Sequence, residues 1–318
     1  MRPFSYPISF VPVVIACALQ APVATVSHAE TVMETTTMER PAPHSAWGGV
    51  TYQTIEVEGI DVFYRAAGPA DAPVVLLLHG YPSSSHMFRD LIPLLAEDYR
   101  VVAPDMVGFG ATEAPPRAEF DYTFDALAAT TNAFTETLGL DQFAIYVFDY
   151  GAPIGFRLAV AHPERITAII TQNGNIYAEG LTVGWDPIQT YWAAPTQENR
   201  EALRKFQSLA TTTWQYTHGT PKDRAARIGT DGPAHDMRNF TRPEGSDIQL
   251  DLFLDYQTNV ALYLEWQSYL RTHQPPVLVV WAENDPFFGP EGAHAFTRDV
   301  PDAELHLLDA GHFALETH

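Results

Sequence analysis

The chain has 318 residues, of which 46% are hydrophobic, enough for one large domain or two small ones with a substantial core. Its 39 acidic residues outnumber its 18 basic residues, which gives a formal charge of −21, and no run of basic residues occurs. This balance argues against nucleic acid or anionic lipid as a partner, so we expect the acidity to serve solubility.

The N-terminal 29 residues have the pattern of a signal peptide. Arg2 precedes an apolar stretch, residues 8–26, and small residues surround a candidate cleavage site after Ala29. Two prolines and a glutamine within the stretch argue against a stable membrane span. We therefore predict export to the periplasm or the cell exterior, with residues 30–47 as a flexible leader. Weaker alternatives are lipid attachment at Cys17, the sole cysteine, and an unstructured tail.

Strand and helix patterns alternate from residue 48 to residue 172. Residues 52–57 and 60–64 alternate in polarity around Glu58-Gly59 and predict a hairpin. The continuously apolar run 73–78 is typical of a central strand that is covered on both faces. Further strands are predicted at 100–104, 143–148 and 166–171, and helices at 86–96, 124–138 and from Gly151 onward. This order predicts an α/β fold with a mostly parallel sheet flanked by helices.

The pattern changes between residues 173 and 272, which are rich in aromatic residues and helical in periodicity. Strands resume at 276–281 and 304–308, with a helix at 293–297 between them. We therefore predict a body formed by 48–172 and 273–318, and a helical cap, 173–272, inserted after the sixth strand. Such a cap is typical of a lid over a pocket, although most of its aromatic residues are expected to serve packing.

Asp149 lies at the bend where a predicted strand turns sharply into a helix. A carboxylate there sits on a strained turn, beside the positive end of the helix, which we expect to keep the acid ionised. An ionised carboxylate that faces a pocket can attack carbon. The alternative is an ordinary helix N-cap, because Asp is a favoured capping residue.

Two further polar residues, Asp285 and His312, follow two later strands of the predicted parallel sheet, 276–281 and 304–308. Each has a structural alternative on its own, as a turn residue before Pro286 or as a capping residue after Gly311. The carboxyl ends of parallel strands line the ligand crevice of an open α/β sheet. The chain order of nucleophile, acid and histidine therefore favours a catalytic triad of Asp149, Asp285 and His312.

Five segments resemble an α/β-hydrolase-fold enzyme of the epoxide hydrolase and haloalkane dehalogenase group. They are HGYPSS (79–84), DMVGFG (105–110), FDYGAPIGF (148–156), WAENDPFF (281–288) and DAGHFALE (309–316). The resemblance extends over about residues 50–318.

The resemblance implies a two-step mechanism without a cofactor or metal. Asp149 would attack a substrate carbon to form an ester, and His312, oriented by Asp285, would activate the water that hydrolyses it. The backbone N–H groups of Tyr81 and Tyr150 are the implied oxyanion donors. The implied partners are water and a small apolar epoxide or haloalkane, and the sequence does not indicate an oligomeric state.

The group that stabilises the leaving atom separates the two activities. Epoxide hydrolases use two cap tyrosines, and Tyr191 and Tyr256 resemble them; cap packing is the alternative for each. Dehalogenases commonly have Trp after the nucleophile and often Asn after His-Gly, where this chain has Tyr150 and Tyr81. We therefore favour epoxide hydrolysis to vicinal diols. A dehalogenase using a cap tryptophan, Trp185 or Trp192, or a binding homologue without turnover, remains the alternative.

Several residues depart from the family pattern. Val147 stands two residues before the nucleophile, where Gly is usual, and Gln257 stands where Arg usually follows the second cap tyrosine. The resemblance also leads us to expect a closing helix after His312, yet only six residues follow it. Asn173 and Asn175 occupy a loop where some relatives place the second acid. As amides they cannot carry that charge, which supports the acid after the later strand.

Overall fold

The computed structural model describes residues 49–318. The predicted signal peptide, 1–29, and the predicted leader, 30–47, lie outside the described residues.

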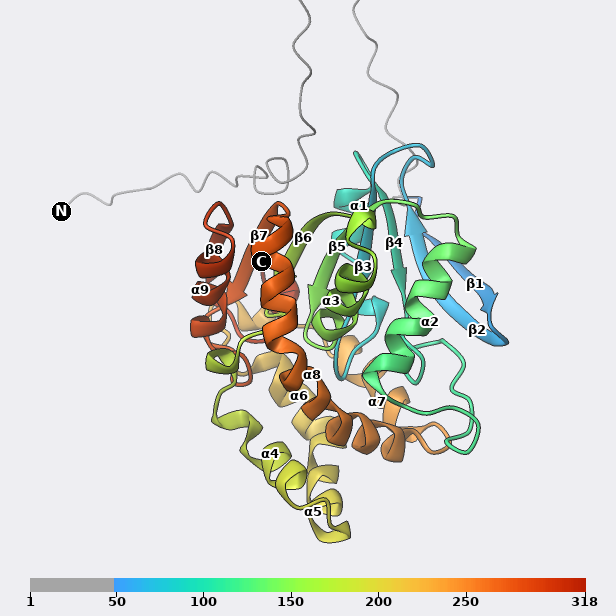
Figure 1. Ribbon diagram of the computed structural model, residues 1–318. Helices are drawn as coiled ribbons and strands as arrows, with labels where there is room; N and C mark the ends of the chain where they lie inside the picture. The colour runs from blue at the N-terminus through green and yellow to red at the C-terminus, as the bar shows by residue number, and fades with distance from the viewer. Residues whose placement is uncertain (1–48) are drawn as a thin grey trace, which may run out of the picture.

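An eight-stranded sheet forms the centre of the body, in the order β1-β2-β4-β3-β5-β6-β7-β8 (Figure 1). The strands β1 and β2 pair antiparallel with each other, β2 pairs antiparallel with β4, and all the remaining neighbours are parallel. The strands are β1 (Thr51–Val57), β2 (Ile60–Ala67), β3 (Val74–Leu78), β4 (Arg100–Pro104), β5 (Phe143–Phe148), β6 (Ile166–Gln172), β7 (Val277–Ala282) and β8 (Glu304–Leu308).

The hairpin of β1 and β2 has the two-residue turn that the sequence predicts. Glu58 and Gly59 have φ values of 51° and 86°, and Val57 pairs with Ile60 across the turn. Two left-handed residues give a turn whose twist matches that of the flanking strands.

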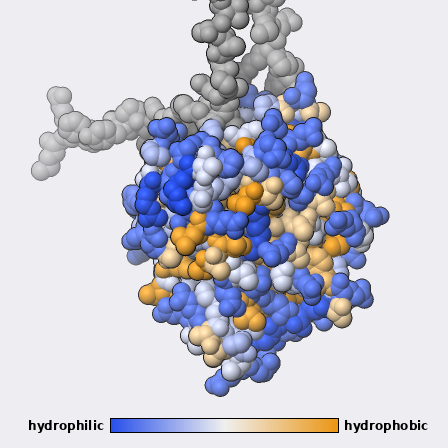
Figure 2. Space-filling model, viewed as in Figure 1, coloured by the Kyte–Doolittle hydropathy of each residue, from blue (hydrophilic) through white to orange (hydrophobic). Residues whose placement is uncertain are grey.

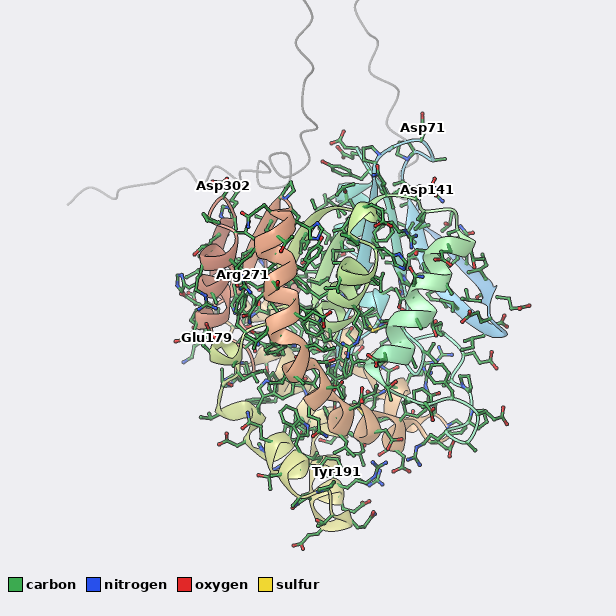
Figure 3. All side chains as sticks on the ribbon, viewed as in Figure 1. Asp71, Asp141, Glu179, Tyr191, Arg271 and Asp302 are labelled. Atoms are coloured by element: carbon green, nitrogen blue, oxygen red, sulfur yellow. The ribbon has the colours of Figure 1, made fainter. Side chains whose placement is uncertain are left out.

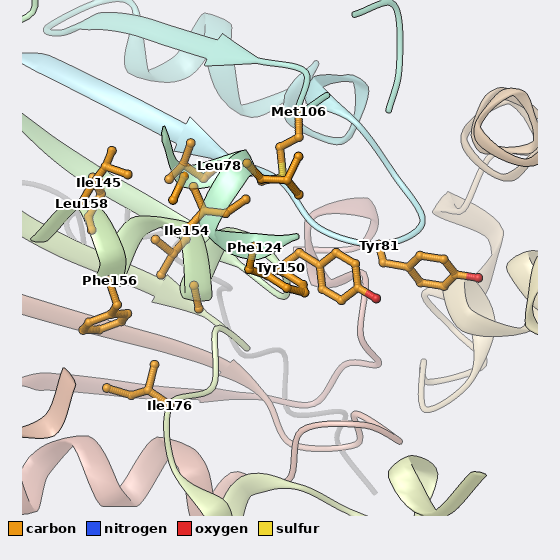
Figure 4. Packing of buried hydrophobic residues seen from close by; sticks show 14 of the residues in the cluster. Leu78, Tyr81, Met106, Phe124, Ile145, Tyr150, Ile154, Phe156, Leu158 and Ile176 are labelled. Atoms are coloured by element: carbon orange, nitrogen blue, oxygen red, sulfur yellow. The ribbon is translucent and has the colours of Figure 1, made fainter. Parts of the chain in front are cut away.

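Both faces of the sheet are buried, and alternate residues of each central strand point to opposite sides. Leu76, Leu78 and Ile145 belong to one hydrophobic cluster, whereas Leu77 and Tyr146 belong to the other. Figure 4 shows the first cluster, in which Ile154 and Leu158 of α3 (Gly151–Ala161) pack against these strands. Burial on both sides explains why these strands are continuously apolar in sequence.

Helices cover the sheet as expected for an α/β fold (Figure 1). Besides α3, the body has α1 (Leu91–Leu95), α2 (Phe124–Thr137) and α9 (Pro290–Asp299), with short 3₁₀ turns at Ser85–Phe88, Pro163–Arg165 and Ala314–Glu316. The predicted helix 86–96 is instead a 3₁₀ turn followed by α1. Pro93 explains the break: it has no N–H to donate to the preceding turn, and it is tolerated only because it lies in the first turn of a new helix.

The cap lies between β6 and β7 and is helical throughout, apart from turns and loops. It contains α4 (Asp186–Ala193), α5 (Gln197–Ala202), α6 (Leu209–Thr217), α7 (Asp231–Thr241) and α8 (Gly245–His273), with 3₁₀ turns at Ala178–Gly180, Val183–Trp185, Leu203–Gln207 and Ala225–Arg227. The long helix α8 begins among the cap helices and runs back along the body beside α3 (Figure 1). One rigid helix therefore joins cap and body, and the predicted fold class is confirmed.

The surface in Figure 2 is mostly hydrophilic, as the composition leads us to expect, with separate smaller patches of hydrophobic residues. Among residues 49–318, no helix combines the length and the apolar character needed to cross a membrane.

Candidate active site

Asp149 lies on the sharp turn between β5 and α3, with a left-handed φ of 48°. Neighbouring glycines make this turn possible. A Cβ at Gly151 would collide with the carbonyl oxygen of Leu78, and a Cβ at Gly80 would collide with the carboxyl group of Asp149. A non-glycine residue at positive φ is strained, so the surrounding packing must hold the carboxylate in this position.

Val147 occupies a position where the family pattern leads us to expect Gly, and the structure shows how it is accommodated. One methyl group of Val147 lies 2.5 Å from the position that a Cβ of residue 155 would occupy. The other lies 3.0 Å from the corresponding position at Gly174. Glycines at 155 and 174 therefore leave the space that the larger side chain fills, so Val147 does not distort the turn.

The carboxylate of Asp149 is buried and is held by a backbone donor. The N–H of Tyr81 donates to Oδ1 at 2.6 Å. Burial raises the pKa of Asp149 to about 6, although His312 and the N–H groups of Tyr81 and Tyr150 act in the opposite direction. Desolvation thus outweighs the helix end that was expected to keep the acid ionised, yet Asp149 is still charged at pH 7.

His312 faces Asp149 and is oriented by Asp285. Its Nδ1 lies 2.7 Å from Oδ2 of Asp285, and all three side chains are buried. Burial opposes the charged imidazole, but Asp285 and then Asp149 outweigh it and raise the pKa of His312. With Nδ1 engaged by a carboxylate, Nε2 is the nitrogen that can take a proton.

Asn173 positions Asp285, a role that the sequence did not reveal. Its Nδ2 donates to Oδ2 of Asp285 at 2.8 Å, and its Oδ1 accepts from the N–H of Ala282. The other oxygen of Asp285 accepts from the N–H groups of Phe287 and Phe288, at 2.8 and 3.2 Å. Every direction around this carboxylate is thereby fixed, which orients the imidazole in turn.

Asp149 and His312 line one cavity between body and cap. The body contributes Tyr81, Asp149, Tyr150, Phe287 and His312, and the cap contributes Trp185, Ile188, Phe206, Gln215 and Phe253. The lining is mostly apolar, with a carboxylate and an imidazole at one place, as in sites for small organic molecules. Within residues 49–318, no three His, Cys, Asp or Glu side chains are grouped so as to hold a metal ion.

A family model described as the alpha/beta hydrolase fold matches residues 73–318. The chain belongs to the α/β-hydrolase fold family. An uncharacterised hydrolase of Saccharomyces cerevisiae is 44% identical over 274 residues, which cover 84% of this chain and 92% of the yeast protein.

Two further relatives of this α/β-hydrolase are described as haloalkane dehalogenases. The protein from Mycobacterium marinum is 29% identical over 80% of this chain and 83% of its own length. The crystal structure of DbeA from Bradyrhizobium elkani matches with a TM-score of 0.67 at 20% identity, covering 84% of this chain and 92% of that one, which shows the fold alone. The protein is therefore a hydrolase that is similar to haloalkane dehalogenases.

The two cap tyrosines singled out in the sequence do not line the cavity of this α/β-hydrolase. Tyr191 is buried on α4, low in the cap (Figure 3), where its hydroxyl accepts from Arg200 at 3.3 Å. Tyr256 on α8 is fully buried behind Trp185, with ring centroids 4.4 Å apart, and its hydroxyl lies 3.5 Å from that of Tyr263.

The cap tryptophans proposed as halide donors both use their indole N–H groups within the protein. Trp185 donates to the carbonyl oxygen of Phe287 at 3.0 Å, and Trp192 donates to that of Phe253 at 2.7 Å. Neither indole N–H is therefore free to bind a leaving group in this arrangement of the cap.

Proposed function

We propose that this α/β-hydrolase opens epoxides to vicinal diols through a covalent ester on Asp149. One observation carries the proposal: Asp149, held by the N–H of Tyr81, and His312, backed by Asp285, line the same largely apolar cavity. A carboxylate nucleophile suits attack on an alkyl carbon, because the ester that forms has a carbonyl group that water can attack.

In the first step, Oδ2 of Asp149, the oxygen that the N–H of Tyr81 does not bind, attacks a ring carbon. A carbon–oxygen bond forms to the carboxylate, one carbon–oxygen bond of the oxirane breaks, and the electron pair remains on the departing oxygen. The N–H of Tyr81 keeps Oδ1 turned away from the substrate. The mainly apolar walls exclude bulk water, which favours the carboxylate as the nucleophile.

In the second step, Nε2 of His312 takes a proton from water, which attacks the ester carbonyl carbon. Negative charge then develops on Oδ1, where the N–H of Tyr81 already donates, and the N–H of Tyr150 adds a second donor. Ester formation removes the charge of Asp149, which is one of the charges that raise the pKa of His312. The imidazole therefore loses its proton more readily at the stage when a base is needed.

Epoxides are favoured over haloalkanes by the donors that face the cavity. Its polar lining includes one phenol with a hydroxyl that is unpaired within residues 49–318, Tyr150, whereas the hydroxyl of Tyr81 and the nearby indole N–H groups are engaged by carbonyl oxygens. A phenol can both donate a hydrogen bond and give up a proton, which suits a developing alkoxide.

Haloalkane dehalogenation by the same ester mechanism is the second candidate. It is favoured by the similarity to named haloalkane dehalogenases, including one that aligns over most of both chains.

A matched pair of substrates separates the two reactions. Epoxyhexane and bromohexane have the same carbon chain and differ only in the leaving atom. We expect diol from the first at a kcat/KM at least about tenfold above that for bromide release from the second. Faster bromide release would make the enzyme a dehalogenase, and turnover of neither substrate nor of their aromatic analogues would contradict the proposed function. D149N is the control for background hydrolysis.

A further inference from the structure

We propose that the side-chain hydroxyl of Tyr150 is the group that protonates the departing oxygen of the substrate. This inference rests on the proposed function and adds a side-chain role to a residue considered so far only for its backbone N–H. It starts from an unpaired polar atom: the hydroxyl oxygen of Tyr150 is buried and has no hydrogen-bond partner among residues 49–318.

A buried hydroxyl without a partner destabilises a protein, so its presence calls for an explanation. Tyr150 lines the cavity together with Asp149 and His312. Figure 4 shows its ring extending away from the aliphatic residues of the sheet, in the same direction as the ring of Tyr81. A substrate oxygen in the cavity would therefore supply the partner that the protein does not.

The other phenols near the cavity are already engaged. The hydroxyl of Tyr81 donates to the carbonyl oxygen of Phe206 at 3.0 Å. The hydroxyl of Tyr191 is bound by Arg200, and that of Tyr256 lies within hydrogen-bond distance of Tyr263. Among these four tyrosines, Tyr150 alone combines a position on the cavity wall with an unpaired hydroxyl.

The surroundings of Tyr150 keep its phenol neutral, as a donor must be. Aromatic rings enclose it, with Phe124 at 4.8 Å and Tyr256 at 5.7 Å between ring centroids. Burial, followed by the charge of Asp149, raises the pKa of Tyr150 well above its usual value. The phenol therefore holds its proton until an oxygen that is more basic, such as an alkoxide, forms beside it.

The proton balance of the reaction then closes. Oδ2 of Asp149 bonds to carbon, the ring carbon–oxygen bond breaks, and Tyr150 gives its proton to the departing oxygen. In ester hydrolysis His312 takes one proton from the attacking water, the bond between the carbonyl carbon and the alkoxy oxygen breaks, and the alkoxide that leaves takes the second proton of that water. The proton on His312 then returns to the Tyr150 phenolate. One water is consumed for each diol. With a haloalkane, Tyr150 would donate a hydrogen bond to the halide and keep its proton.

The test separates ester formation from ester hydrolysis. H312Q removes the base, so the ester accumulates and its rate of appearance with epoxyhexane can be followed by intact mass. We expect Y150F in this background to slow ester formation by at least about 10²-fold, as loss of one charge-stabilising donor does. The matched control is Y146F, which removes the hydroxyl of a buried tyrosine of β5 whose partner is Gln172. Y146F should leave the rate within about twofold.

Thermal unfolding provides the second readout. Y146F breaks a paired hydrogen bond and should lower Tm, whereas Y150F removes an unpaired hydroxyl and should leave Tm equal or higher. Ester formation at an unchanged rate in Y150F, or a clear fall in its Tm, would overturn the role of Tyr150 alone. No ester with any epoxide in H312Q itself would overturn the proposed function, and this inference with it.

Discussion

The body and the cap contribute to the same cavity in different ways. The body holds Asp149, Asp285 and His312 at the ends of paired strands, and a donor or a partner fixes each of them. The cap contributes mainly apolar walls, and the indole N–H of Trp185 and the hydroxyl of Tyr191 are bonded elsewhere in the protein. In the proposed mechanism, the body therefore carries the chemistry, while the cap shapes the space and excludes water.

The sharpest test of this comparison is the nucleophile itself. D149N keeps an acceptor for the N–H of Tyr81 but cannot form the ester, so we expect kcat to fall by at least about 10⁴-fold. The fall would be measured with epoxyhexane. Residual activity within about tenfold of the wild type would mean that water attacks the substrate directly.

The same substitution should stabilise the protein at neutral pH. Burial raises the pKa of Asp149 to about 6 from a reference value of 3.8, so the charged form is unfavourable in the folded state. The buried charge therefore lowers the free energy of unfolding of the wild type by its whole amount above pH about 6, and it has no effect below pH about 4. We expect D149N to raise Tm by a few degrees at pH 7.5, with the difference shrinking as the pH falls. A constant difference across this range would contradict the buried-charge explanation.

Loss of Asn173 should weaken catalysis less than loss of the nucleophile but more than a cap substitution. N173A leaves Asp285 with one donor fewer on the oxygen that holds His312, so we expect kcat to fall by about 10- to 100-fold. N175A is the matched control, because within residues 49–318 that amide bonds to Tyr177 and Tyr263 and not to Asp285. If N175A were as damaging as N173A, the loss would reflect the fold of the loop rather than the position of Asp285.

The pH profile distinguishes the two half-reactions. Ester formation needs ionised Asp149, so its single-turnover rate should fall about tenfold per pH unit below pH about 6. Ester hydrolysis needs neutral His312, and Asp285 raises the pKa of this imidazole. Ester should therefore accumulate in mildly acidic buffer, where it can be detected by rapid quenching and mass measurement. No dependence of ester formation on pH between 5 and 7 would be inconsistent with Asp149 as nucleophile.

The smallest effect is expected for the cap tyrosine that the family resemblance suggested. The hydroxyl of Tyr191 accepts from Arg200 and does not reach the cavity, so Y191F should change kcat/KM by less than about twofold. A loss above about tenfold would mean that the cap rearranges around substrate and brings this phenol to the reacting atoms.

What could be predicted from the sequence follows the same division between body and cap. The strands are short apolar runs with fixed side-chain alternation, so the residues that follow β5, β7 and β8 had to lie at one edge of the sheet. This is why the sequence alone predicts that Asp149, Asp285 and His312 lie close together. The raised pKa of Asp149 could not be predicted from the sequence, because burial depends on how cap and body pack together.

The sequence of the cap does not predict where its side chains point, because helix orientation depends on packing that short motifs do not specify. Tyr191 fits a family motif, yet its helix turns the hydroxyl to Arg200. Asn173 was noticed only as an amide that cannot be the acid, and its bond to Asp285 crosses 112 residues of chain. Gln215 gave no signal at all, although its side chain lines the cavity from α6.

Single turnover in water enriched in heavy oxygen tests the ester on Asp149 most directly. With enzyme in excess over epoxide, water attacks the ester carbonyl, so the heavy oxygen should enter the carboxylate of Asp149 and be absent from the first diol released. Digestion and mass measurement of the peptide that contains Asp149 would locate it. Heavy oxygen in the diol, with an unlabelled Asp149, would contradict the covalent mechanism.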